Sequence, residues 1–159
     1  YNVRLAPLMK AEKKYDDVPL ADINRVFEAI QNKIEEGKLL EWAQFVGNYY
    51  GTPKDYVDQL LNEGKNVVLE IEVQGALQVM KKCPDATTIF IVPPSLEELE
   101  RRIRGRRTED EEIVQQRLAK ARKEIATKDE YKYVVENDDL IAAKNKIADI
   151  IRNHRTNQG

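Results

Sequence analysis

Two short apolar runs constrain the fold of this chain more than any other feature of its sequence. They are residues 67–73 (VVLEIEV) and residues 87–92 (TTIFIV). Both are rich in β-branched residues, and runs of this kind are typical of buried strands in a parallel sheet. Residues 75–82 lie between them and are expected to be helical. This alternation predicts an α/β fold with a parallel sheet and helices packing on both of its faces.

The periodicity of apolar residues predicts three further elements. Apolar residues between Ile23 and Ile34 recur at spacings of three and four, which gives one stripe on a helix, and Gly37 is a natural stop. Residues 39–46 are expected to be extended, with Trp42 and Phe45 supplying bulk. Residues 133–136 form a third short strand in this interpretation.

Three polar residues are expected to cap helices. Thr52 precedes Pro53, Ser95 follows a proline pair, and Asp139 precedes the last apolar periodic segment. Serine, threonine and aspartate accept hydrogen bonds from free N–H groups at helix starts, and proline suits the first helical position. The first and last of these helices are expected to end near Gly64 and near Arg152.

The composition predicts one soluble globular domain. The chain has 159 residues, of which 42% are hydrophobic and 34% charged, and its net charge of −2 gives no basic field for nucleic acid or anionic lipid. No apolar run approaches the roughly 20 residues that cross a bilayer, and no signal peptide is recognised, so a cytoplasmic location is expected. The single cysteine, Cys83, excludes an internal disulfide and is expected to be a small buried hydrophobe.

Two acids interrupt the first apolar run, at Glu70 and Glu72. Side chains two residues apart on a strand share a face, so both carboxylates are expected to project the same way. A buried carboxylate needs a cation, hydrogen-bond donors or solvent. The pair therefore lies either at a water-facing strand end or in a site at the carboxyl end of a parallel strand, where α/β folds place their ligands.

A second group of polar residues lies in residues 41–53 (EWAQFVGNYYGTP). It offers an acid, two adjacent tyrosines and a threonine at a turn. A carboxylate suits guanine, whose edge presents adjacent N1 and N2 donors, and tyrosine hydroxyls suit a phosphate monoester because they donate without adding charge. The alternative is an aromatic hairpin packed on the core.

Residues 96–129 are predicted to be charged and helical, apart from an interruption at residues 104–108. Guanidinium groups match phosphate oxygens bidentately and stabilise a transferring phosphoryl group. The alternative is a solvated face, because acids lie nearby, but a glycine between arginines favours a mobile lid. The arginines concerned are Arg101, Arg102, Arg104, Arg106 and Arg107, with Arg117 further along.

Five ordered motifs together resemble the guanylate kinase family, in its bacterial form, over roughly residues 25–152. The resemblance implies a P-loop nucleoside-monophosphate kinase fold with a small GMP-binding subdomain and a helical lid. It also implies transfer of the γ-phosphoryl group of ATP to GMP, with Mg²⁺. The motifs are residues 37–53 (GKLLEWAQFVGNYYGTP), 68–75 (VLEIEVQG), 90–99 (FIVPPSLEEL), 104–109 (RGRRTE) and 134–140 (VVENDDL).

The resemblance also implies roles for individual residues of this chain. Glu41 and Glu72 would bind the guanine edge, with Thr52 as a hydroxyl partner, and Tyr50 would hold the GMP phosphate. Glu70 would lie near the metal and its waters. In the lid, Arg106 and Arg117 would clamp the phosphates, and Asn137 would lie near the donor nucleotide. The implied division is a GMP-binding subdomain at residues 1–53, an α/β core at residues 54–95 and 130–159, and a lid with its flanking helices at residues 96–129.

The sequence departs from the family pattern in three places. The G-x-x-x-x-G-K-[ST] loop that cradles donor phosphates is absent, since Gly37 is the first glycine. Residues 1–24 match none of the family's motifs for that part of the GMP-binding domain. Arg107 stands where the lid motif usually has glycine. This chain alone is therefore expected to bind GMP weakly and to show negligible kinase activity.

Three hypotheses remain open from the sequence. The first is a guanylate kinase whose P-loop is missing from these 159 residues, acting as a monomer or homodimer on GMP and ATP, without nucleic-acid or membrane partners. The second is a non-catalytic binding module for GMP or a phosphopeptide. The third is another nucleoside-monophosphate kinase, whose base is selected by Glu41, Thr52 and Glu72.

Overall fold

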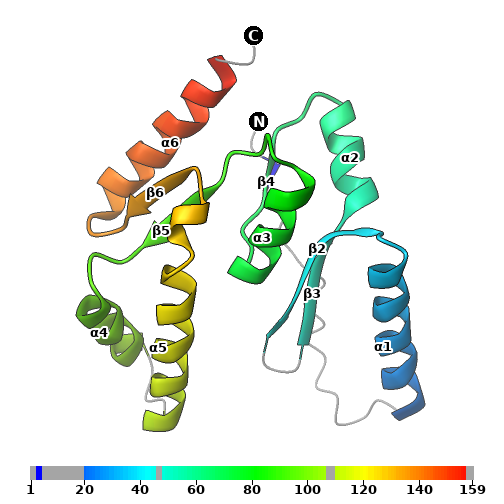
Figure 1. Cartoon of the computed structure of the whole chain (residues 1–159), viewed down its shortest axis with the longest axis horizontal. Coiled ribbons are helices and arrows are strands. Elements are labelled where there is room, and N and C mark those ends of the chain that lie inside the picture. Colours follow the sequence, from blue (N-terminus) through cyan, green and yellow to red (C-terminus); the bar gives the residue numbers. More distant parts are fainter. Residues whose placement is uncertain (1–2, 5–19, 46–47, 107–109, 157–159) are drawn as a thin grey trace. The chain divides into compact units, whose positions relative to one another are not determined.

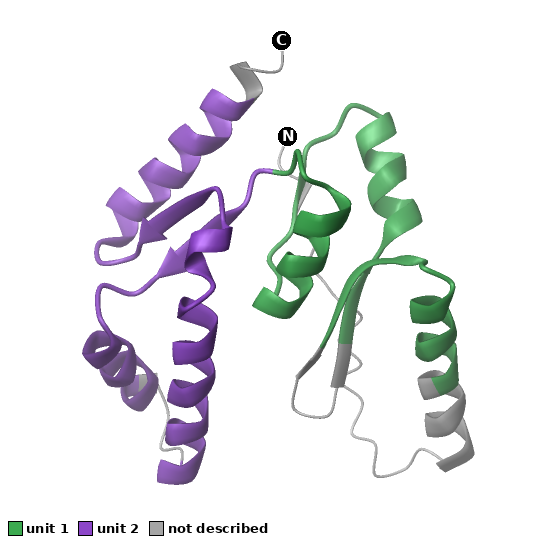
Figure 2. Ribbon diagram, in the orientation of Figure 1, with its two compact units in different colours: residues 1–86 green, residues 87–159 purple. Residues whose placement is uncertain are grey.

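The computed structural model describes residues 3–4, 20–45, 48–106 and 110–156. The chain forms two compact units, Tyr1–Ala86 and Thr87–Gly159, coloured green and purple in Figure 2. Within the described residues, no helix is both long enough and apolar enough to span a membrane. Each unit has its own packed elements.

The first unit contains a parallel strand pair, an antiparallel hairpin and three helices among its described residues (Figure 1). Helix α3 packs against strand β2, as do α1 and α2. In chain order the elements are β1 (Val3–Arg4), α1 (Leu20–Glu35), β2 (Leu39–Phe45), β3 (Asn48–Pro53), α2 (Lys54–Asn62), β4 (Val67–Val68) and α3 (Val73–Lys82).

Helix α1 and strand β2 confirm the prediction from apolar periodicity. The turn between them contains Gly37 at φ 65°, a left-handed conformation that glycine adopts without a steric penalty. Strand β2 covers the predicted extended segment as far as Phe45, and Val46 lies outside the described residues. Strands β2 and β3 pair antiparallel, with a register irregularity between Leu39 and Glu41, where the start of β2 meets the end of β3.

The predicted capping role of Thr52 is wrong. The chain stays extended through Pro53, which is the N-cap of α2, and no side chain bonds to the free N–H groups there. Thr52 lies within β3, and its hydroxyl donates to Glu41 on the neighbouring strand. A threonine inside a paired strand points across the sheet, so it cannot fold back onto a helix start.

The predicted strand at residues 67–73 is also wrong beyond its first two residues. Only Val67–Val68 pair in a ladder, with Val3–Arg4 as their parallel partner. Residues 69–72 carry no assigned strand, and helix α3 begins at Val73 rather than at Gly75. A strand needs hydrogen bonds from a neighbour along its length, and the described partner is two residues long.

The core of the first unit lies between α2, α3 and the strands. Leu40, Val57 and Val79 are buried together. Half-buried residues pack against them, and each fully buried aliphatic side chain contributes about 1.5–3 kcal/mol. Cys83 belongs to this outer group, so the prediction that it packs as a hydrophobe is right although its burial is partial. The outer group comprises Val67, Leu69, Ile71, Cys83 and Ala86.

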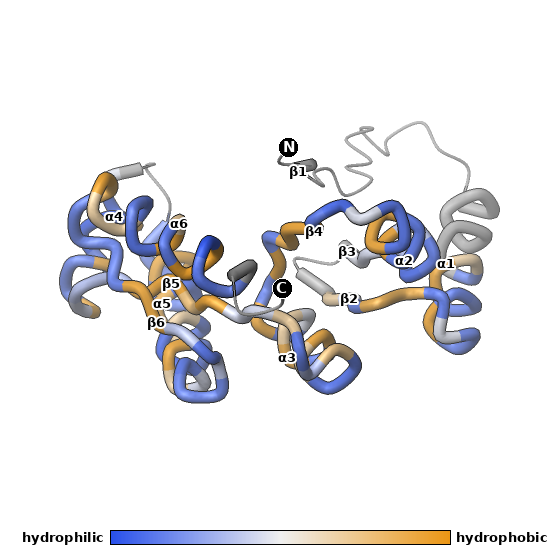
Figure 3. The backbone as a smooth tube through the Cα atoms, turned by 90° about the horizontal axis from the view of Figure 1, so that it is seen from above, coloured by the Kyte–Doolittle hydropathy of each residue, from blue (hydrophilic) through white to orange (hydrophobic). Residues whose placement is uncertain are grey.

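The second unit is built on two parallel strands, β5 (Ile89–Val92) and β6 (Tyr133–Glu136), in the register Ile89 with Tyr133 through Val92 with Glu136. The predicted third strand at residues 133–136 is therefore confirmed. Figure 3 shows β5 as an apolar segment of the tube. The remaining elements are α4 (Leu96–Arg106), α5 (Glu111–Ile125), a 3₁₀ turn at Lys128–Glu130, and α6 (Leu140–Thr156).

Two of the predicted caps are confirmed in the second unit. The Ser95 hydroxyl accepts from the main-chain N–H of Glu98 at 3.1 Å, in the first turn of α4. The Asp139 carboxylate accepts from the N–H of Ala142 at 2.7 Å, in the first turn of α6. Each satisfies one of the N–H groups that a helix leaves free at its start.

The core of the second unit is small and dense. Leu118 of α5 and Val135 of β6 are essentially inaccessible to solvent. Phe90 of β5 meets the ring of Tyr131 edge to face, with ring centres 4.9 Å apart. Helix α4 packs on α5, and α6 packs on β6. Besides these, the buried apolar residues are Val114 and Ala143.

Candidate functional site

Glu41 is the one charged side chain that is buried among the residues the structure describes, with 3% of its surface exposed. It lies in β2, the strand against which α3 packs. A carboxylate removed from water is costly unless hydrogen bonds or a cation compensate. Such a residue either has a structural partner or is kept for a ligand.

The first contact of Glu41 comes from the opposite strand. Glu41 and Thr52 are directly paired in the β2–β3 ladder, and the Thr52 hydroxyl donates to Glu41 Oε1 at 2.5 Å. Tyr50 lies two residues before Thr52 on the same strand, so both side chains leave the same face of the hairpin. Tyr50 is half-buried, opposite Ala43.

The second contact of Glu41 is with the first turn of α3. A Cβ atom placed on Gly75 would overlap the other carboxylate oxygen, Glu41 Oε2. Any side chain at this position would therefore have to displace the Glu41 carboxylate. Glu72 is the N-cap of the same helix. The positive end of a helix favours a nearby negative charge, which helps to keep a carboxylate at this place.

Burial raises the pKa of Glu41 above its usual value, while the Thr52 hydrogen bond and the charge of Lys82 act in the opposite direction. The net direction is upward, because desolvation exceeds the two favourable interactions. Glu41 is therefore incompletely compensated in this structure. Incomplete compensation at a buried acid is typical of a binding or catalytic site.

The two acids of the apolar run are both exposed. Residues 67–72 alternate between half-buried and exposed, with Val68, Glu70 and Glu72 on the exposed side. The two carboxylates thus share a face, as the spacing predicted, although residues 69–72 are not in a ladder. In the first unit the structure brings Glu41 and Thr52 together beside the helix that Glu72 caps.

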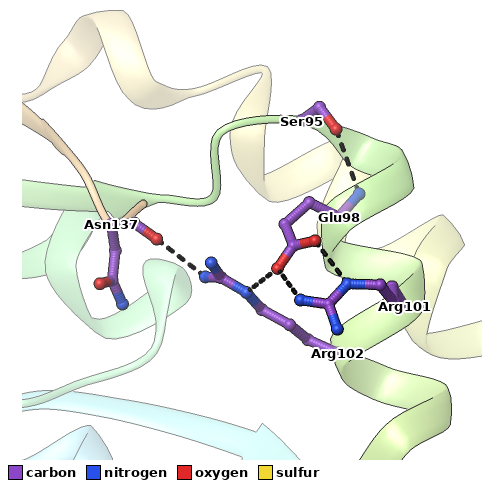
Figure 4. Close-up of polar contacts among 5 residues, drawn as sticks. All are labelled: Ser95, Glu98, Arg101, Arg102 and Asn137. Carbon is purple, nitrogen blue, oxygen red and sulfur yellow. Dashed lines mark hydrogen bonds and ion pairs between the residues drawn. The ribbon is translucent and has the colours of Figure 1, made fainter. Parts of the chain in front are cut away.

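In the second unit, two neighbouring arginines share one acid (Figure 4). Glu98 accepts from Arg101 at 2.7 Å and from Arg102 at 2.6 Å. These interactions hold the pKa of Glu98 down at about 2. Arg102 also donates to the main-chain oxygen of Asn137 at 2.8 Å, which links α4 to the residue after β6.

Arg104 joins helices α4 and α5. It pairs with Glu100 on its own helix and with Glu111 at the start of α5. The Arg104 guanidinium, with Gln115, lowers the pKa of Glu111 to about 2. Of the five clustered arginines, Arg101, Arg102 and Arg104 are thus paired with acids, as the solvated-face interpretation expects.

The remaining predicted residues of the second unit are placed only in part. Arg106 ends α4, and its side chain lies outside the described residues, as does Arg107. Arg117 is exposed on α5, next to the buried Leu118 and three residues after the buried Val114. Asn137 is half-buried, and its N–H donates to Val92 at the end of β5.

Sequence reasoning missed three residues around Glu41, all on α3. They are Gly75, Gln78 and Lys82, whose contacts reach β2. Their spacing places them on one helix stripe with the buried Val79. Two polar residues on a buried stripe were the signal that could have revealed them.

Comparison with known proteins gives one consistent family. A family model described as guanylate kinase matches residues 24–154. A guanylate kinase of Bacillus cereus is 55% identical over 124 residues, which is 78% of this chain and 60% of that protein. A guanylate kinase of Synechococcus sp. is 56% identical over 116 residues, 73% of this chain and 54% of that protein. The chain thus spans 60% or less of the length of these two relatives.

A solved structure is also similar. It is a crystal structure of guanylate kinase from Anaplasma phagocytophilum, with a TM-score of 0.63 and 30% sequence identity. The match covers 92% of this chain and 70% of that chain. The prediction of an α/β fold of the nucleoside-monophosphate kinase type is confirmed by this likeness. On the family model and these identities together, the chain belongs to the guanylate kinase family.

Proposed function

We propose that the protein carrying this chain transfers the γ-phosphoryl group of ATP to GMP, giving ADP and GDP, and that this chain supplies the GMP site. The relatives named guanylate kinase support the reaction. The main observation that supports this site is the buried carboxylate of Glu41. Desolvation raises its pKa more than the Thr52 hydrogen bond and the charge of Lys82 lower it. A ligand that offers two N–H donors would complete the site.

Guanine offers those donors on its N1 and N2 edge. The carboxylates of Glu41 and Glu72 accept from them, and the Thr52 hydroxyl holds Glu41 in place while completing the polar lining. Adenine presents a bare ring nitrogen where guanine carries N1–H, so its lone pair would face the Glu41 carboxylate. A buried acceptor such as Glu41 disfavours a ligand that leaves it unpaired.

Tyr50 is proposed to bind the phosphate of GMP. Its hydroxyl leaves the same face of β3 as the Thr52 side chain, so the two hydroxyls serve neighbouring parts of one nucleotide. A phenol donates a hydrogen bond without bringing a charge. That suits the GMP phosphate, because its oxygen must remain nucleophilic toward the γ-phosphoryl group of ATP.

The residues proposed for phosphate transfer belong to the second unit. Arg106 and Arg117 would clamp the transferring phosphoryl group, since guanidinium forks match phosphate oxygens. Asn137 would lie near the donor nucleotide. In this proposal residues 1–53 form the GMP-binding subdomain, residues 54–95 and 130–159 the core, and residues 96–129 the lid and its flanking helices.

Mg²⁺ is proposed to arrive with ATP. No group of three or more histidine, cysteine or acidic side chains arranged for a metal occurs in the part of the chain that the structure describes. Mg²⁺ in kinases is usually held by one or two carboxylates plus substrate phosphates and waters. The exposed Glu70 carboxylate fits that mode through a water. When bound, the ion neutralises charge on the phosphates.

A cytoplasmic location and a monomeric or homodimeric state remain part of the proposal.

Calorimetric titration tests the site. The complete gene product should bind GMP at least about tenfold more tightly than AMP, as expected from one charge-assisted hydrogen bond. Glu41→Gln should remove that preference, whereas the control Glu98→Gln should keep it. Equal affinity for the two nucleotides in the wild type would refute the proposed site.

A coupled assay of ADP release then tests the reaction. The complete gene product should transfer phosphate from ATP to GMP. Tight and selective GMP binding without any transfer would instead favour the non-catalytic binding module.

A further inference from the structure

Strand β2 is bonded along one edge by side chains of α3. Trp42 N–H donates to Gln78 Oε1 at 3.2 Å, and Gln78 Nε2 donates to Trp42 O at 2.6 Å. One side-chain amide thus meets both main-chain groups of a single residue, as a neighbouring strand would. The second Nε2 hydrogen bonds to Gln74 O at 3.1 Å, which fixes the amide's orientation on its own helix.

Lys82 extends this edge one helical turn further. Its Nζ donates to Leu39 O at 3.0 Å and to Leu40 O at 2.8 Å. The main chain is therefore held by α3 on both sides of Glu41, at residues 39–40 and at Trp42. Gly75, one turn in the other direction along α3, touches the Glu41 carboxylate itself. Gly75, Gln78 and Lys82 thus lie on one stripe of α3, and all three lie against residues 39–42 of β2.

Charge-assisted hydrogen bonds depend on donor–acceptor distances near 2.7–2.9 Å. A displacement of about 1 Å in a recognition group can remove most of its benefit. Trp42 is the residue directly after Glu41, so a shift of its main chain moves the Glu41 side chain relative to α3. Glu72, the other proposed acceptor, caps that same helix. The separation between the two acceptors is thus set where α3 holds β2.

We propose that Gln78 is a positioning residue for base selection: its amide fixes the Trp42 main chain against α3 and so sets the place of the Glu41 carboxylate. The inference rests on the proposed GMP site. Gln78 does not touch the nucleotide; it acts through Glu41. A purely structural glutamine would contribute to stability and change the affinity for every nucleotide equally.

The test measures equilibrium dissociation constants of GMP and AMP for the complete gene product, without ATP. In Gln78→Met, which keeps side-chain length and loses both hydrogen bonds to Trp42, the preference for GMP over AMP should fall about tenfold, the effect of one weakened charge-assisted hydrogen bond. The matched control is Gln59→Met on α2, whose amide donates to the exposed Glu63 side chain. That variant should keep the wild-type preference.

A double-mutant cycle shows whether Gln78 acts through Glu41. In the Glu41→Gln background, Gln78→Met should cause no further change in the ratio of the two dissociation constants. If Gln78→Met does not fold, Gln78→Glu replaces it, because the carboxylate still accepts from Trp42 N–H but cannot donate to Trp42 O. The preference should then again fall.

The outcomes separate this inference from the proposed function. A wild type without preference for GMP would overturn the GMP site and this inference with it. A wild type with the preference, in which the Gln78 variants keep it, would leave the proposed function standing and overturn the positioning role. Additive losses in the cycle would also overturn it.

Discussion

The two units contain glutamates in opposite electrostatic situations. Glu41 in the first unit is buried, and its pKa is raised because desolvation outweighs its partners. Glu98 in the second unit lies near the surface between Arg101 and Arg102, and these hold its pKa at about 2. The charged form of Glu98 is therefore stabilised by its partners, whereas burial disfavours the charged form of Glu41.

The same contrast applies to the arginines of the second unit. Arg101, Arg102 and Arg104 are paired with acids of their own helix or of α5, so these three form a surface network rather than a phosphate clamp. Exposed ion pairs of this kind contribute about 0–1 kcal/mol each. The proposal places the phosphate-binding arginines of this unit at Arg106 and Arg117, as the family resemblance implies.

The largest effect is expected at Arg117. In the complete gene product, Arg117→Ala should lower kcat by about 10³-fold, because phosphate-clamping arginines contribute on that scale. Lysine at this position should rescue only partly, since it lacks the bidentate fork. Stability should change by less than about 1 kcal/mol, as for an exposed side chain.

The matched control for Arg117 is Arg101→Ala, which removes an exposed arginine paired with Glu98 and should leave kcat unchanged. Steady-state kinetics and urea unfolding of the three variants make the comparison. An Arg117→Ala protein that unfolds, or one that retains full kcat, would make Arg117 a structural residue.

A smaller effect is expected from adding one methyl group to a helical glycine in each unit. Alanine at Gly75 overlaps Glu41 Oε2 and should destabilise the protein by about 1–3 kcal/mol, the range for overpacking. Alanine at Gly105 of α4 meets nothing within 4 Å, so its better helix propensity should stabilise by up to about 1 kcal/mol.

Urea unfolding measures the stability of both glycine variants. A double-mutant cycle with Glu41 identifies the cause of the change at Gly75. In the Glu41→Ala background, Gly75→Ala should no longer destabilise, because the overlapping carboxylate is gone. If the penalty persisted there, the close approach of Glu41 would not be its source.

The smallest effect is expected at Glu98. Glu98→Gln should change the free energy of unfolding only slightly at neutral pH, and less still at high salt. The pKa of Glu98 is lowered from 4.5, so its contribution is present above pH 4.5 and is lost as the pH falls through about 2. Thermal melts of wild type and variant from pH 7 to pH 2 test this, and a difference that grew on acidification would contradict it.

The elements with clear local signals could be predicted from sequence. Helix α1 follows from apolar spacing and Gly37, and strands β5 and β6 follow from short apolar runs. The caps at Ser95 and Asp139 follow from residue type and position. The helix and the caps depend on residues within a few positions of one another. The two strands pair with each other at long sequence separation, but their apolar composition is a local signal.

Features that depend on distant partners could not be predicted in the same way. Residues 69–72 have the composition of a strand but no ladder, because pairing depends on a neighbouring strand. Thr52 has the composition of a cap, yet its hydroxyl contacts Glu41 across the hairpin. Gln78 and Trp42 are 36 residues apart, so a polar residue on the buried stripe of α3 indicates a contact but not its partner.

The candidate site could be predicted only in part. Glu41, Thr52, Tyr50 and Glu72 were proposed from residue chemistry and from the family resemblance, and the structure adds the burial of Glu41. Burial could not be predicted, because an acid in an alternating strand is as compatible with a solvent-facing side. The contacts of α3 with β2 could not be predicted either, because they join residues far apart in the sequence.

The central claim is that Glu41 is a buried carboxylate kept for guanine although it destabilises the fold. Its raised pKa implies that the destabilisation is absent below pH 4.5, where both folded and unfolded states are protonated, and appears as the pH rises through the folded-state value. The most direct test compares wild type and Glu41→Gln by thermal melts at pH 7 and pH 4, with GMP titrations at pH 7. The account predicts that the variant is more stable by about 0.5–2 kcal/mol at pH 7, that this difference shrinks at pH 4, and that GMP affinity falls about tenfold to a hundredfold. A variant that is less stable at pH 7 and binds GMP as well as the wild type would contradict it.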